Sequence, residues 1–250
     1  MANAYAGPRL ADCITRLDGR MRGEGFAKTF YMMASNGGVV ALKRARQQPC
    51  AMLESGPVGG CIGAGVYATA LGLERIIAFD MGGTTAKCGI VQNGQFEVKS
   101  PYFVGGEERG FPVRHAVIDI VEVGAGGGSI AWLDEQERVQ VGPRSACSSP
   151  GPACYGLGGT EPTITDANLA LGRISASAFL GGEMRLDEQA GRQAIEKLAT
   201  RLGFKGAGGH DEMAQGIIAL GTLTMASAIK QITTERGLDP RDFALFAFGG

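Results

Sequence analysis

The segment Phe79–Thr85 carries the residue types that bind a phosphate group. After the apolar run 76–79, it contains in order Asp80, Gly82, Gly83, Thr84 and Thr85. Paired glycines in a hairpin bend expose successive backbone N–H groups that can donate to phosphate oxygens, with no side chain in the way. The threonines add hydroxyl donors, and the Asp80 carboxylate could hold Mg²⁺. An ordinary hairpin with a threonine-rich turn explains the same residues, so the local pattern leaves both interpretations open.

A second glycine cluster, Gly124–Ser129, follows another apolar segment. A dinucleotide-binding turn, G-x-G-x-x-G, needs a small apolar residue where Ser129 stands and a helix directly after it. A hairpin is expected there instead, so the sequence argues against a Rossmann domain. The cluster either contacts a phosphate or substrate, or lets chain segments pack closely.

A third glycine motif, Gly249–Gly250, ends the apolar run 243–248. By itself it indicates no function, and it becomes informative only through its order after the other motifs.

Two acidic segments are further candidates for chemistry. Residues 160–168 (TEPTITDAN) run into an expected helix, where Thr165 or Asp166 could simply be the N-cap. The alternative is that Glu161 or Asp166 faces a cleft opposite the phosphates. In the run 117–122, Asp119 and Glu122 differ by three positions, so strand alternation puts them on opposite faces and excludes a simple carboxylate pair. Asp119, between isoleucines, is expected to be buried.

Periodicity and turn residues predict the elements that must position these groups. Helices are expected over 9–22, 40–47, 58–71, 165–171, 187–202 and 211–236, and strands over 30–34, 76–79, 86–92, 96–98, 115–123, 129–133, 138–141 and 243–248. Residues 142–163 are expected to form an ordered loop. Glycine is a poor helix former, so the many small residues of 58–71 predict very close packing against another element.

Composition excludes several classes of protein. The 250 residues include 24 Lys and Arg against 25 Asp and Glu, so there is no basic field to attract nucleic acid or an anionic membrane. Hydrophobic residues make up 44%, enough for a sizeable core. No apolar run reaches the roughly 18 residues of a membrane span, and the first residues lack the order of a signal peptide, so a soluble, cytoplasmic protein is expected. Two histidines exclude a histidine-rich metal centre, and six scattered cysteines indicate reduced thiols.

Five segments together resemble the hydantoinase A/5-oxoprolinase family, which includes the A component of N-methylhydantoinase and the corresponding components of acetone and acetophenone carboxylases. They are ESGPVGGCIGA (54–64), FDMGGTTAK (79–87), PVRHAVIDIVEVGAGGGSIAW (112–132), VGPRSACSSPGPACYGLGGTEPTITDANLALGR (141–173) and ERGLDPRDFALFAFGG (235–250). They span nearly the whole chain. Lys87 departs from the family pattern, because many relatives carry an acidic residue there.

The resemblance implies an α/β fold, an actin-like ATPase lobe of the ribonuclease H-like type, with a mixed sheet flanked by helices and a glycine-rich insertion over 105–165. The nucleotide hairpin would occupy 76–98, and Ser55–Gly60 would begin the helix that connects the lobes. The chain would be the second lobe, truncated at both ends, with the first lobe upstream. The implied site residues are Asp80, Thr84 and Asp166 for catalysis, Asp80 for the metal, and Gly82, Gly83, Thr84, Thr85, Gly249 and Gly250 for the nucleotide.

The activity implied by this family is ATP-dependent hydrolysis of a cyclic amide, such as a hydantoin, N-methylhydantoin or 5-oxoproline, through phosphorylation of the carbonyl oxygen. ATP and Mg²⁺ are the expected cofactors, and a hydantoinase B-type subunit or domain is the expected partner. The alternatives are a component of a ketone carboxylase and a non-catalytic fragment that binds nucleotide or assembles with partners.

Overall fold

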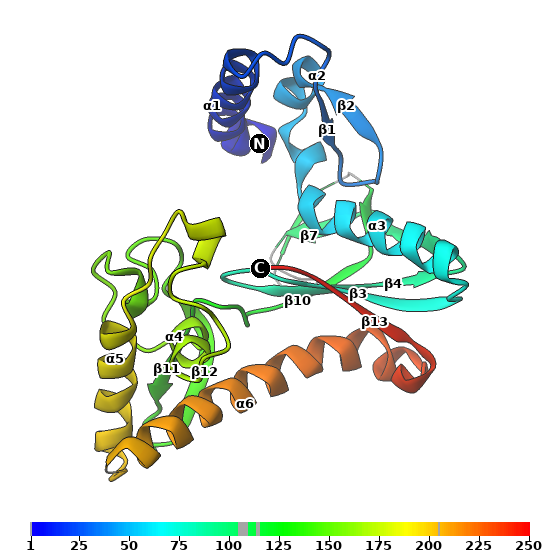
Figure 1. Cartoon of the computed structure of the whole chain (residues 1–250). Helices are drawn as coiled ribbons and strands as arrows, with labels where there is room; N and C mark the ends of the chain where they lie inside the picture. Colours follow the sequence, from blue (N-terminus) through cyan, green and yellow to red (C-terminus); the bar gives the residue numbers. More distant parts are fainter. Residues whose placement is uncertain (1, 105–109, 114–115, 205) are drawn as a thin grey trace. The chain divides into compact units, whose positions relative to one another are not determined.

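The computed structural model describes residues 2–104, 110–113, 116–204 and 206–250 (Figure 1). By its internal contacts the chain divides into two compact units. The first comprises Met1–Ala78, Gly89–Ile120 and Arg241–Phe246, and the second comprises Phe79–Cys88, Val121–Pro240 and Ala247–Gly250. Residues 105–109 and 114–115, which belong to the expected insertion and to the start of the expected strand 115–123, lie outside the described residues.

The α/β class predicted from the sequence is confirmed. The helices are α1 (Ala2–Gly23), α2 (Leu42–Gln47), α3 (Ser55–Leu71), α4 (Ile164–Ala170), α5 (Glu188–Arg201) and α6 (Gly206–Ile232). Short 3-10 helices are η1 (Pro49–Met52), η2 (Ala153–Tyr155), η3 (Phe179–Gly182), η4 (Thr234–Arg236) and η5 (Pro240–Asp242). The strands are β1 (Tyr31–Met33), β2 (Val39–Ala41), β3 (Arg75–Met81), β4 (Ala86–Gln92), β5 (Gln95–Phe96), β6 (Val98–Lys99), β7 (Tyr102–Val104), β8 (Phe111–Val113), β9 (Val117–Ile118), β10 (Ile120–Val123), β11 (Ser129–Leu133), β12 (Val139–Ser145) and β13 (Ala244–Gly249).

A five-stranded sheet has the hydrogen-bonded order β10-β4-β3-β13, with β5 paired to β4. The expected strand 96–98 is wrong as a single strand, because the chain changes partner at Glu97. Phe96 pairs with Val91 of β4, whereas Val98 pairs with Ile118 of β9. The Glu97 carbonyl lies at the switch and accepts a hydrogen bond from Asp119 N at 2.8 Å.

The first unit has a small core under its N-terminal elements. Ile14 of α1, Ala45 of α2 and Met52 pack together with Ala34, which follows β1. Figure 1 shows α1 lying beside α2 and the β1–β2 hairpin. The apolar stripe of the expected helix 9–22 therefore does form a core face, although the helix begins earlier, at Ala2.

The close packing expected for helix α3 occurs at one of its glycines. A Cβ added at Gly65 would lie 3.3 Å from the Gly94 carbonyl oxygen, which is a tight approach. At Gly56, Gly59 and Gly63, an added Cβ would meet no atom within 4 Å in the described part of the chain. Among the described residues, close packing of this helix is therefore seen at Gly65 and not at these three positions, of which Gly59 and Gly63 lie in the range 58–71.

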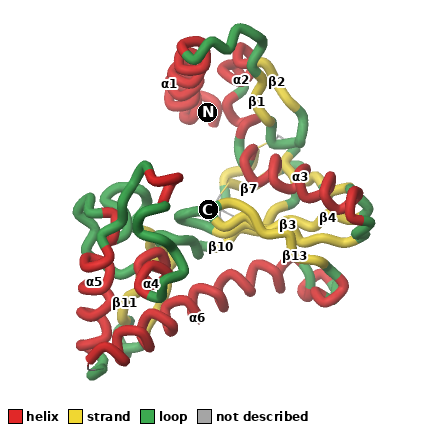
Figure 2. The backbone as a smooth tube through the Cα atoms, viewed as in Figure 1, coloured by secondary structure: helices red, strands yellow, loops and turns green. Residues whose placement is uncertain are grey.

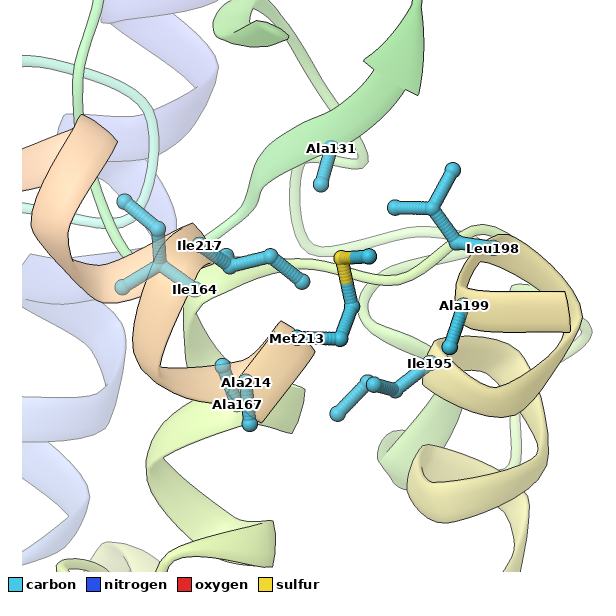
Figure 3. Packing of buried hydrophobic residues seen from close by; sticks show 9 residues of the cluster. All are labelled: Ala131, Ile164, Ala167, Ile195, Leu198, Ala199, Met213, Ala214 and Ile217. Atoms are coloured by element: carbon cyan, nitrogen blue, oxygen red, sulfur yellow. The ribbon is translucent and has the colours of Figure 1, made fainter. Parts of the chain in front are cut away.

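The second unit is built around helices α4, α5 and α6 and the β11–β12 hairpin. Met213 and Ile217 of α6, Ile195 of α5, Ile164 of α4 and Ala131 of β11 belong to one cluster of buried side chains (Figure 3). Ile195 and Ile217 have no exposed surface. The helical stripes predicted at 187–202 and 211–236 thus converge on one core, which supports the loops described below.

Helix α6 is long and apolar enough to raise the question of a membrane span. An 18-residue window within Gly208–Arg236 has a mean hydropathy of 1.2, which meets the length and composition criteria for a span and contradicts the sequence-based expectation that no such segment exists. One such helix is weak evidence, since the core helix of a soluble protein meets the same criteria. Met213, Ala214 and Ile217 are buried in the core of the second unit, which explains part of the apolar character.

Candidate functional site

The hairpin that joins β3 to β4 presents its turn at the surface of the second unit. Phe79 and Ala86 anchor the two sides of the hairpin in the interior. Gly82 N donates to the Thr85 carbonyl at 3.0 Å, which closes the turn, while Gly83 and Thr84 are exposed. A Cβ added at Gly83 would meet no atom of the described residues within 4 Å. The tip of the turn is therefore accessible.

The glycine cluster Gly124–Ser129 supports this turn from one side. Gly127 N donates to the Gly82 carbonyl at 3.0 Å, and Gly128 N donates to the Gly83 carbonyl at 2.6 Å. A Cβ at Gly126 would lie 2.6 Å from the Gly82 oxygen, closer than atoms can approach. The cluster is followed by strand β11 and not by a helix, as expected. Of the two roles left open for it, the structure shows close packing against the hairpin.

This contact determines which way the turn's N–H groups point. In a trans peptide the C=O and N–H groups point in opposite directions. Because the carbonyls of Gly82 and Gly83 face the glycine cluster, the N–H groups of Gly83 and Thr84 face away from it. Two successive N–H groups directed to one side form a concavity that attracts anions.

The glycine cluster is itself fixed by hydrogen bonds, mainly from the first turn of α4 and the end of β12. Gly127 O accepts hydrogen bonds from Thr165 N at 2.8 Å and from Thr165 Oγ1 at 2.9 Å. Gly126 N donates to Ser129 Oγ at 2.9 Å, and Ala146 N donates to Gly128 O at 2.8 Å. The first turn of α4 and the end of β12 thus fix the cluster, and the cluster fixes the hairpin. The sequence analysis singled out Thr165 only as a possible N-cap beside Asp166. It did not predict that Thr165 would hold the glycine cluster.

The remaining expected nucleotide residues lie at the same place. Gly249, at the end of β13, has a φ of 92°, and a Cβ there would overlap Asp80 Oδ1 and lie 2.7 Å from the Met81 carbonyl oxygen. The absent side chain therefore allows β13 to end against the Asp80 carboxylate. Gly250 follows with a φ of 127°. The structure thus places Gly249 against Asp80 and Met81, next to the turn 82–85, and the binding of a nucleotide by these residues stays a prediction.

Asp166 is placed differently from the expectation that it acts in catalysis. Its carboxylate is fully buried and accepts hydrogen bonds from Ala153 N, Cys154 N, Thr163 N and Thr163 Oγ1 at 2.8 to 3.3 Å. The N-cap of α4 is Thr163, and Asp166 completes a capping box, so the expected cap at Thr165 or Asp166 is also corrected. Four hydrogen-bond donors thus satisfy the buried Asp166 carboxylate, which gives it a structural role.

The thiol beside Asp166 titrates unusually. Burial raises the pKa of the Cys154 thiol, and the Asp166 carboxylate raises it further. Burial is also the main cause that raises the pKa of Tyr155. A buried neutral thiol is a poor nucleophile, which agrees with the sequence-based interpretation of Cys154 as a packing residue. All six cysteines are reduced, as expected.

Two other acidic residues also have partners. Asp119 is 7% exposed and lies 3.2 Å from Lys99 Nζ, which compensates its buried charge. Glu161 is exposed and accepts hydrogen bonds from Arg144. Ser145, next to Arg144, donates to Thr84 Oγ1 at 3.4 Å. No local signal pointed to Arg144 or Ser145, and Ser145 reaches the hairpin only because β12 ends beside it.

Comparison with known proteins identifies the family. The model of the hydantoinase/oxoprolinase family matches residues 1–250. The chain belongs to this family. The alpha subunit of caprolactamase from Pseudomonas jessenii is 39% identical over 253 residues, covering 100% of this chain and 35% of its own. The acetophenone carboxylase gamma subunit from Aromatoleum aromaticum is 38% identical, with 92% and 31% covered. This chain therefore spans about a third of the length of such family members.

Solved structures confirm the fold. The crystal structure described as an ATP-dependent caprolactamase from Pseudomonas jessenii matches with a TM-score of 0.73 and 38% identity over 99% of this chain and 35% of that one. A nucleotide-free acetone carboxylase, described in terms of ATP-dependent acetone carboxylation, matches with a TM-score of 0.81 and 27% identity over 94% of this chain and 32% of that one. This hydantoinase-family chain shares with them an actin-like ATPase-type fold.

Proposed function

We propose that this hydantoinase-family chain supplies part of an ATP site for the hydrolysis of a cyclic amide. The observation that carries the proposal is the pair of N–H groups, on Gly83 and Thr84, that the glycine cluster turns toward one side of an exposed bend. Phosphoryl transfer asks a protein mainly for positioning and electrostatic stabilisation, and such donors provide both for the terminal phosphates.

The chemistry begins at the amide carbonyl oxygen, which attacks the γ-phosphorus of ATP while the bond to ADP breaks. The phosphorylated oxygen withdraws electrons from the ring carbon, so that water can add to it. The adduct then releases inorganic phosphate and breaks the ring C–N bond, and the nitrogen takes up a proton from the water. The turn 82–85 orients the phosphates, and the Thr84 hydroxyl adds a donor. Ring opening is proposed to need the hydantoinase B-type partner, together with the first lobe of the same protein.

Mg²⁺ is proposed to accompany the nucleotide at Asp80. Within the described residues no group of three or more His, Cys, Asp or Glu side chains could hold a metal ion. Mg²⁺ does not need such a group, because it commonly binds one or two carboxylates, the substrate phosphates and water. Asp80, at the end of β3 beside the turn, fits that pattern. The bound ion would neutralise charge on the phosphates.

A ketone carboxylase is the second candidate, and the acetophenone and acetone carboxylase relatives favour it. In that reaction ATP would activate a ketone and bicarbonate.

We further propose that the protein works in the cytoplasm, where reduced cysteines such as its six are usual.

The test is ATP turnover by the full-length protein with its partner subunit. Asp80→Ala should lower lactam-dependent ADP release by at least about 100-fold, since one electrostatic contact to the transferring group is lost. Asp242→Ala, which removes an exposed carboxylate paired with Arg75, is the matched control and should leave the rate unchanged. Unchanged turnover in Asp80→Ala would refute the site. ADP release that depends on ketone and bicarbonate instead of lactam would favour the carboxylase.

A further inference from the structure

A cavity of about 430 Å³ lies in the second unit between the end of β12 and the loop that leads to α4. Its lining includes Arg144, Ser145, Cys147, Thr160 and Glu161. Ser145 belongs both to this lining and to the nucleotide hairpin, through its hydrogen bond to Thr84 Oγ1. A molecule in the cavity would therefore lie next to the proposed phosphate turn.

The walls of the cavity are held in shape by the fold. Gly151 N donates to the Ala146 carbonyl at 3.1 Å, and a Cβ at Gly159 would overlap the Gly151 carbonyl oxygen. Cys147 has a φ of 56°, a conformation that side-chain-bearing residues rarely adopt, and its N–H donates to Ser145 Oγ at 3.1 Å. Figure 2 shows that much of the connection between β12 and α4 is loop, so these contacts supply the order that regular structure does not. Preformed pockets of this size are typical of small-molecule sites.

The polar face of the cavity offers a donor beside an acceptor. One guanidinium nitrogen of Arg144 lies 2.9 Å from both carboxylate oxygens of Glu161. Their side chains are 54% and 48% exposed, so the pair is accessible and contributes little to stability. A guanidinium carries five N–H donors and a carboxylate accepts about four hydrogen bonds, so this pairing does not exhaust either group.

We propose that this cavity binds the amide edge of a cyclic amide, with Arg144 donating to the carbonyl oxygen and Glu161 accepting from the N–H. This inference rests on the proposed function and adds to it the place where the lactam sits. A small ring holds its amide cis, so the N–H and C=O lie on the same edge, side by side. That edge matches a donor and an acceptor placed together. The second lone pair of the carbonyl oxygen remains for the phosphorus.

The same geometry selects against other substrates. A ketone has the carbonyl oxygen but no N–H, and an N-methylated lactam replaces the N–H by a methyl group. Either would bind without the hydrogen bond to the Glu161 carboxylate and would gain only the one from Arg144 to the carbonyl oxygen. The cavity therefore favours the cyclic-amide hydrolase over the ketone carboxylase.

Binding can be measured without turnover because Cys147 is an exposed thiol in the cavity lining. In the full-length protein with its partner subunit, iodoacetamide labelling of Cys147 is followed by peptide mass spectrometry, with the exposed Cys13 as internal control. Saturating ε-caprolactam or hydantoin should slow labelling of Cys147 by about tenfold and leave Cys13 unchanged. N-methyl-ε-caprolactam at the same concentration should give no protection. If neither lactam protects Cys147, or if the N-methyl compound protects equally, the proposal is wrong.

Variants provide the second readout. Arg144→Met and Glu161→Gln should each raise KM for ε-caprolactam by about 10- to 150-fold, as expected for the loss of a hydrogen bond to a charged group, and should abolish its protection of Cys147. The Kd for ATP should stay as in the wild type. Arg138→Met, which removes an exposed arginine paired with Asp134 elsewhere on the β11–β12 hairpin, is the matched control and should change neither. An unchanged KM in both cavity variants would overturn the site. Lactam protection without any ATP binding would instead refute the proposed function while sustaining the cavity.

Discussion

The bend at Gly83 allows the phosphate proposal to be tested with a single methyl group. Gly83 lies at the exposed tip of the turn, outside the positive-φ glycines, so alanine can adopt its backbone conformation. The added Cβ of Gly83→Ala would meet no described atom within 4 Å. We therefore expect folding to be nearly unaffected, with a change in unfolding free energy within about 0.5 kcal/mol, as for surface substitutions generally.

The effect on ATP should be much larger. If the phosphates lie against this backbone, the methyl group occupies their path and weakens the hydrogen bonds from Gly83 N and Thr84 N. A hydrogen bond to a charged group is worth about 1.5–3 kcal/mol. Loss of one such bond corresponds to an increase in the Kd for ATP of about 10- to 150-fold, since roughly 1.4 kcal/mol is a factor of ten.

Isothermal titration of the full-length protein with ATP gives the Kd, and thermal unfolding shows whether the variant is folded. The control is Gly216→Ala in helix α6, where an added Cβ likewise meets no described atom within 4 Å. It should stabilise the protein by about 0.5–1 kcal/mol through helix propensity and leave ATP binding unchanged. A folded Gly83→Ala protein with wild-type affinity for ATP would refute the reasoning.

Three other perturbations follow from the contacts around the turn. Gly126→Ala places a Cβ 2.6 Å from the Gly82 oxygen, so thermal unfolding should show a loss of about 1–3 kcal/mol together with weaker ATP binding; wild-type values for both would contradict the bracing role. Asp166→Asn turns an NH₂ group toward one of four donors and should cost about 2–4 kcal/mol in urea unfolding, while the folded fraction keeps its affinity for ATP. Because burial raises the pKa of Cys154, the folded state keeps the thiol protonated after the unfolded thiol ionises. Stability should therefore be complete below about pH 8.5 and fall above it by up to about 1.4 kcal/mol per pH unit. Cys154→Ala should remove this slope, which denaturation between about pH 8 and 10, below the titration of the unfolded Tyr155, would measure.

Local patterns in the chain were enough to predict most elements and the family. The 3.6-residue stripes of 187–202 and 211–236 appear as α5 and α6, since an apolar stripe specifies both a helix and its buried side. The run from Phe79 to Thr85 predicted a hairpin turn from its glycine pair, and the local pattern left open whether that turn binds phosphate. Five motifs together indicated the family and its fold, and both are confirmed.

What holds the turn, and what lies beside it, depends on contacts between distant parts of the folded chain. The carbonyls of Gly82 and Gly83 meet the glycine cluster more than 40 positions later, and no local pattern encodes such a pairing. The same holds for Asp166, whose carboxylate is used by backbone donors at positions 153, 154 and 163. An aspartate in a motif is written the same way in the sequence whether its carboxylate binds a ligand or accepts hydrogen bonds inside the fold. Only its burial and its donors in the folded chain separate the two roles.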